Sequence, residues 1–144
     1  MGKIVSLLLV LFMFFTGYSA VDAAVDKYDE AATVLKPYVP ALKRYLVVAE
    51  KSQDPEEIAQ AMNTLSDSME DLAPKLQRLT KKYPGIENAE NLPARHVPFK
   101  NELVGLMDRF TQSYVRLLPL MTYPQIRQAN SRMLNIMSSV GATM

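Results

Sequence analysis

Residues 54–82 read DPEEIAQAMNTLSDSMEDLAPKLQRLTKK, and this stretch indicates the fold class more clearly than any other. Its apolar side chains recur every three or four residues, at Ile58, Met62, Leu65, Met69, Leu72, Leu76 and Leu79. This spacing places them on one face of an α-helix, where they can pack against neighbouring helices. An acidic N-cap, Asp54, is followed by Pro55 and two glutamates, which is typical of a helix start. We therefore predict a helix over 55–82.

Three further stretches repeat this spacing and predict helices over about 26–51, 99–121 and 124–140. The chain is thus expected to be all-α. Its connections are short, long and short, and the long one is a loop over 84–98 without apolar periodicity. This order of connections is typical of an up-down-up-down antiparallel four-helix bundle.

Prolines interrupt three of the predicted helices, at Pro37, Pro40, Pro74 and Pro119. Each removes a backbone hydrogen bond and is expected to kink or split its helix. The first helix is the strongest case, since two prolines lie close together and could divide it near Lys36.

Residues 1–23 have the parts of a secretory signal peptide: Lys3, an apolar run over 7–15, and small residues before Ala23. We expect cleavage after Ala23, which leaves a single domain over 24–144, periplasmic or secreted, without a stable membrane span. The alternative is an uncleaved N-terminal membrane anchor, because residues 4–21 carry no charge. The chain has no cysteine, so disulfides and thiolate metal sites are excluded.

Charge is unevenly distributed between the two halves of the domain. Residues 24–90 hold 12 acidic and 9 basic side chains, whereas residues 91–144 hold 2 acidic and 6 basic ones. This basic excess is too sparse to indicate nucleic-acid binding. We expect instead that the two halves attract one another within the fold.

The only histidine, His96, lies beside Arg95 in a segment bracketed by Pro93 and Pro98. We interpret it as a solvated loop residue. Two alternatives are a rigid recognition loop that presents Arg95 and His96, and a metal or haem ligand. One histidine without cysteine or a spaced carboxylate does not make a metal site by itself.

Methionines lie on two of the apolar stripes, Met62 and Met69 on one, Met133 and Met137 on the other, with Met107 and Met121 nearby. Thioethers are soft ligands that can hold copper(I). Methionine also fills irregular gaps in cores, and proline-kinked helices create such gaps. We interpret these residues as core, with a copper(I) site as the alternative.

No catalytic arrangement is evident in the sequence. The apolar stripes carry no acid, no serine has a helical histidine partner, and there is no glycine-rich phosphate loop. Ser113 and Asn130 are the polar residues on the stripes, and we expect a buried hydrogen bond between them that fixes helix register.

The signal-like start, four helices and long middle connection resemble the cytochrome b-562 family of haem-carrying periplasmic bundles. The likeness is clearest over 51–62 and over 99–108, with its Leu103-Val104-Gly105 core. It implies the bundle fold. In that family, haem is held by a methionine early in the first helix and a histidine late in the fourth. Here Asp29 and Glu30 occupy the first region and Thr143 and Met144 the second, so the resemblance does not extend to the haem ligands.

Together these features predict an exported, non-enzymatic binding or interaction module of the cell envelope, without cofactor or metal. Its partner would be an envelope protein or a small ligand, and the sequence leaves the oligomeric state open. A haem or copper(I) carrier is the alternative, and an enzyme of unidentified type is the third interpretation.

Overall fold

A computed structural model describes the backbone of residues 25–84, 86 and 92–142, and within these ranges every regular element is helical. These residues form four long α-helical stretches. The first consists of α2 (Val25–Leu35) and α3 (Val39–Lys51), and the other three are α4 (Pro55–Lys82), α5 (Val97–Leu117) and α6 (Pro124–Ala142). Three 3₁₀ turns, η2 (Lys36–Tyr38), η4 (Ala94–His96) and η5 (Leu118–Thr122), join or extend them. The predicted signal peptide and its cleavage site lie outside the described residues.

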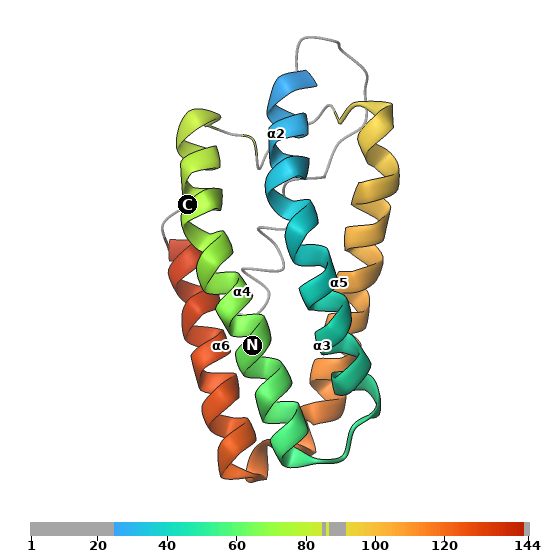
Figure 1. The fold of residues 1–144 in the computed structure, drawn as a ribbon, viewed down its shortest axis with the longest axis vertical. Coiled ribbons are helices and arrows are strands. Elements are labelled where there is room, and N and C mark those ends of the chain that lie inside the picture. Colours follow the sequence, from blue (N-terminus) through green and yellow to red (C-terminus); the bar gives the residue numbers. More distant parts are fainter. Residues whose placement is uncertain (1–24, 85, 87–91, 143–144) are drawn as a thin grey trace.

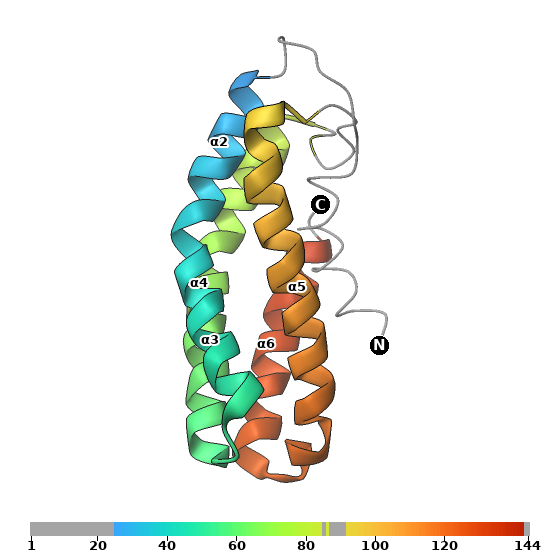
Figure 2. The same ribbon diagram turned by 90° about the vertical axis from the view of Figure 1, so that its right-hand side faces the viewer.

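The helices lie side by side along one long axis (Figures 1 and 2), with α2 and α3 following one another in a single column. Helix α4 packs against α2, α3 and α6, and α3 also packs against α5. Buried side chains from all of these helices form one continuous hydrophobic core. No helix in the described ranges is long and apolar enough to cross a membrane.

Helix α4 confirms the prediction from residues 54–82, including its bounds. The Asp54 side chain accepts a hydrogen bond from the Glu56 backbone N–H at 2.9 Å, as an N-cap does. The Ser52 hydroxyl accepts a bond from the Asp54 N–H at 3.1 Å and donates to the Glu57 carboxylate. Two orphan donors at the helix start are thereby satisfied.

The other boundaries differ from the predicted ones. The connection predicted over 84–98 ends earlier, because η4 occupies 94–96 and α5 begins at Val97. Pro98 suggested a loop, yet it lies in the first turn of α5, where its missing N–H would have no helical partner. At its other end, the regular α-helix stops at Leu117 and continues as η5, which contains Pro119, whereas we predicted helix to 121.

The residues of the first predicted helix form two α-helices, α2 and α3. The 3₁₀ turn η2 separates α2 from α3 and contains Pro37, while Pro40 lies in the first turn of α3. Pro74, in contrast, lies inside α4 without ending it.

Helix α6 is shorter than α4, with 19 residues against 28, and ends well below the end of α4 (Figure 1). At a rise of 1.5 Å per residue, α6 is about 13 Å shorter than α4. Beyond this point the connection between α4 and α5 contributes to the core, since Ile86 and Leu92 are only 1% and 7% exposed. The connection thus supplies apolar side chains at the end that α6 does not reach.

Ion pairs join the acidic first half of the domain to the basic second half, as the charge distribution predicted. Arg109 binds both oxygens of Glu50 at 2.7 and 2.9 Å, and Arg132 contacts Asp67 at 2.6 Å. These side chains are partly exposed, so each pair contributes at most about 1 kcal/mol. Their main effect is to favour one pairing of helices over others.

Arg116 provides the first testable prediction. Its guanidinium donates to the backbone carbonyls of Ala49 at 2.8 Å and Ser52 at 2.9 Å, at the C-terminal end of α3. Because those carbonyls lack helical partners, we expect Arg116→Ala to lower the free energy of unfolding by about 1–2 kcal/mol. Urea unfolding, monitored by circular dichroism, measures this change in the free energy of unfolding. The exposed Arg127→Ala on α6 is the control, and equal losses in both variants would contradict the capping role.

Candidate functional site

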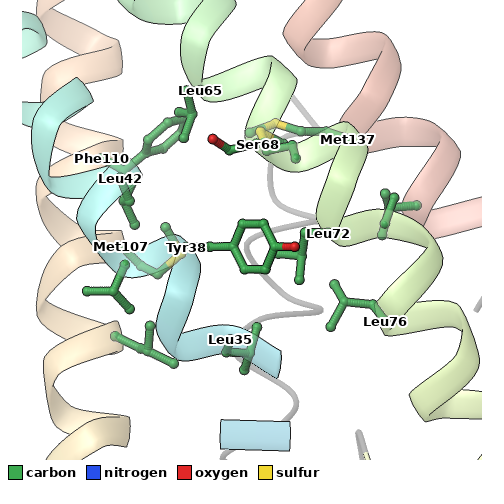
Figure 3. A pocket seen from close by; sticks show the side chains of 15 residues that line it. Leu35, Tyr38, Leu42, Leu65, Ser68, Leu72, Leu76, Met107, Phe110 and Met137 are labelled. Carbon is green, nitrogen blue, oxygen red and sulfur yellow. The ribbon is translucent and has the colours of Figure 1, made fainter. Parts of the chain in front are cut away.

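An apolar cavity lies in the middle of the bundle and is the best candidate for a functional site (Figure 3). Its volume is about 90 Å³. Side chains from η2, α2, α3, α4, α5 and α6 line it, and all but Tyr38 and Ser68 are apolar. Apolar cavities bind small apolar molecules, and an enclosed one of about 150 Å³ accepts benzene or xenon. The cavity is therefore suited to a small apolar group.

Three of the six methionines named from the sequence reach this cavity. Met69 and Met137 line it, together with Met107 from α5. Met62 and Met133 are fully buried elsewhere in the core. Three thioethers from three helices thus border one space, and their flexible side chains can adapt to different contents.

His96 is not the solvated loop residue that the sequence suggested. It is only 7% exposed, at the end of η4, and its ring lies 6.4 Å from that of Tyr28. Its Nε2 atom is 2.9 Å from one carboxylate oxygen of Asp29 in α2, while Arg95 donates to the other oxygen at 2.6 Å. The turn η4 carries the ring inward, which composition alone does not reveal. Arg95 and His96 thus bind α2 and hold the start of α5 against it.

The residues around the cavity do not fit haem. His96 is not among the lining residues, and no other histidine exists in the chain. The volume of about 90 Å³ is also well below the 300–1,000 Å³ typical of pockets for larger ligands. Within the described ranges, no group of three or more His, Cys, Asp or Glu side chains could hold a metal ion.

The hydrogen bond predicted between Ser113 and Asn130 is absent. The buried Ser113 hydroxyl donates to the carbonyl of Phe110 in its own helix at 2.9 Å. The Asn130 Oδ1 atom is buried without a hydrogen-bond partner. A serine side chain is short enough to bond its own helix backbone, and this local bond replaces the one expected between helices.

Tyr38 closes one side of the cavity. Figure 3 shows its ring extending from η2 toward Leu72 of α4, with Leu35 below it in this view. Its hydroxyl donates to the Asp71 carboxylate and accepts a bond from Lys75 Nζ at 2.5 Å. Lys75 also contacts Asp71 at 2.8 Å, and this bond holds the pKa of Asp71 below and that of Lys75 above its usual value. Tyr38 was not predicted as a site residue, because its only signal in the sequence is its position between Pro37 and Pro40.

A second, more polar groove continues from this edge along the interface of α2 and α4. Its volume is about 300 Å³, and it is lined by Glu30, Val34, Lys75, Arg78, Leu79 and Lys82. Lys82 pairs with Glu30 at 2.7 Å, and this bond raises the pKa of Lys82. Among the residues the structure describes, Arg78 forms no ion pair. The groove therefore carries an excess of positive charge.

The ion pairs predict how stability depends on pH. Hydrogen bonds from Arg95, Lys82, Arg109 and Lys75 lower the pKa values of Asp29, Glu30, Glu50 and Asp71, respectively. A carboxylate with a lowered folded-state pKa stabilises the fold above its unfolded pKa of about 4 and loses this effect as pH falls through the folded value.

We therefore expect a constant contribution from these pairs between pH 7 and 5, and a falling melting temperature below about pH 4. Glu50→Gln should weaken this acid dependence. Asp108→Asn is the matched control, because the exposed Asp108 has no ion pair within the described ranges. Calorimetry between pH 7 and 3 checks the prediction, and unchanged slopes in Glu50→Gln would contradict it.

Comparisons with known proteins found no matching family model, no matching curated protein and no matching solved structure. The likeness to cytochrome b-562 therefore rests on the layout of the sequence.

Proposed function

We propose that this chain is a non-enzymatic binding module, exported to the cell envelope, that holds a small apolar ligand in the cavity of its helical core. The observation that carries the proposal is the cavity itself, which is lined almost entirely by leucine, methionine and other apolar side chains. Such a lining binds by excluding water and offers no group for chemistry. The signal-like N-terminus supports export.

The proposal includes an up-down-up-down antiparallel bundle whose helices bend at their prolines. The short connections support it, since Ser52 to Asp54 alone separate α3 from α4, and Tyr123 alone lies between η5 and α6. Helices joined by such short turns pack as antiparallel neighbours. A bend at Pro37 brings the Tyr38 ring to the cavity edge, so the fold and the site are connected.

Xenon binding tests the proposed site directly. We expect xenon to change the methyl NMR shifts of Met107 and Met137 in the chain over 24–144. Ala73 lines the cavity, and Ala73→Leu should fill the space and abolish these changes. Ala61→Leu is the control on the same helix, because Ala61 packs against the core away from the cavity. Ser68→Leu is an independent filling variant. Wild-type protein that shows no response to xenon would overturn the proposal.

A copper(I) carrier is the second candidate, favoured by the three thioethers of Met69, Met107 and Met137 around one space. Titration with copper(I) against a chromogenic chelator tests it. A carrier should compete for the metal and lose this ability in Met137→Leu, whereas Met121→Leu should bind normally. Failure of the wild-type protein to compete would remove this candidate.

A further inference from the structure

We infer that the ligand is an anionic amphiphile with one alkyl chain, whose chain end occupies the apolar cavity and whose head group occupies the basic groove between α2 and α4. The inference rests on the proposed function and adds the chemical class of the ligand. Two separate features support it: an apolar space that is small, and a cationic groove that begins at its edge.

The cavity and the groove follow one another along the same helix interface. Leu35 and Leu76 line the cavity, while Val34 and Leu79 line the groove. Tyr38 belongs to the cavity and Lys75 to the groove, and their side chains are in contact at 2.5 Å. Tyr38 therefore separates the cavity from the groove, and an alkyl chain that occupies both must displace its ring and then continue past Val34 and Leu79.

The charges of the groove select the head group. Lys75, Arg78 and Lys82 recur on one face of α4, and Glu30 faces them from α2. Asp71 and Glu30 neutralise the two lysines, which leaves the guanidinium of Arg78 to bind an anion. A guanidinium presents a planar pair of donors that matches a carboxylate or a phosphate. A cationic head group would be repelled at the same place.

The size of the cavity sets the dependence on chain length. A volume of about 90 Å³ holds only the last few carbons of an alkyl chain. Each methylene that enters an apolar space adds about 0.8 kcal/mol, which corresponds to about fourfold in affinity. Affinity should therefore rise steeply over the first few added carbons. Beyond that length, carbons in the open groove remain partly hydrated and should add less.

The experiment compares head groups and variants on the purified protein. Calorimetric titrations use n-alkyl carboxylates, n-alkyl phosphates, n-alkanols and n-alkyl trimethylammonium salts of equal chain length. We expect the two anionic series to bind at least tenfold more tightly than the cationic one. Arg78→Ala should lower the affinity for both anions severalfold and leave alkanol affinity unchanged. The control is Arg44→Ala, an exposed arginine on α3 that lines neither space.

The outcomes separate the inference from the proposed function. Equal affinities for anionic, neutral and cationic amphiphiles, or no effect of Arg78→Ala, would overturn the head-group assignment while the cavity still binds xenon. If the unmodified protein binds only one of the two anionic series, and Arg78→Ala weakens that binding, the inference holds for that head group and fails for the other. Absence of binding by every amphiphile together with absence of xenon binding would overturn both.

Discussion

Leu106→Asp is expected to prevent folding of the domain. Leu106 is 4% exposed and packs in the core from α5. The substitution removes a packed side chain and leaves an unpaired carboxylate or its neutral acid in apolar surroundings, where either form is costly. A loss of several kcal/mol is comparable to the whole stability of a domain, about 5–15 kcal/mol. Circular dichroism should show a strong reduction of the helical signal and no cooperative melting.

The matched control is Leu118→Asp, the same chemical change at a position 42% exposed to solvent. There the carboxylate remains hydrated, so a change within about 0.5 kcal/mol is expected. Leu65→Asp, at a residue 6% exposed in α4, should repeat the effect of Leu106→Asp. A folded Leu106→Asp variant with native melting would show that the interface of α5 with the core is assigned wrongly.

His96→Ala is expected to lower the free energy of unfolding by about 2–3 kcal/mol. The variant loses a buried ring next to Tyr28 and the contact of Nε2 with Asp29. From the sequence alone we would expect no change, since a solvated loop histidine contributes little. The reason for the difference is the position of η4, which places the ring between α2 and the start of α5.

Thermal melting at neutral pH measures this effect, and a fall of several degrees is expected for a domain of this size. Arg95→Ala is the control, because Arg95 shares Asp29 with His96 but its side chain is 49% exposed. It should cost less than about 1 kcal/mol. Equal melting of His96→Ala and the unmodified protein would mean that the buried ring contributes nothing to docking η4 against α2.

Helix positions could be predicted from the sequence wherever a local rule fixes them. The Asp54 cap and the stripe from Ile58 to Leu79 define α4, because capping and helical periodicity depend only on neighbours in the chain. The boundary of α5 was less clear, since Pro98 is compatible with both a loop and a first helical turn.

The contents of the core and its cavity depended on packing between distant segments. Periodicity identifies Met62, Met69, Met133 and Met137 as inward-facing, but it cannot tell which of them touch a cavity and which are enclosed. The predicted hydrogen bond between Ser113 and Asn130 is absent for a related reason. The Ser113 hydroxyl bonds a backbone carbonyl of its own helix, and this local bond competes with a contact to another helix.

The sequence by itself determined that the described residues are all-helical and that the acidic and basic halves attract one another. These follow from residue type and spacing. The tertiary structure alone decided that His96 is buried, that Met69, Met107 and Met137 border one cavity, and that Tyr38 lies beside Lys75. Such juxtapositions arise when helices separated by tens of residues pack together, and no local pattern encodes which side chains then meet.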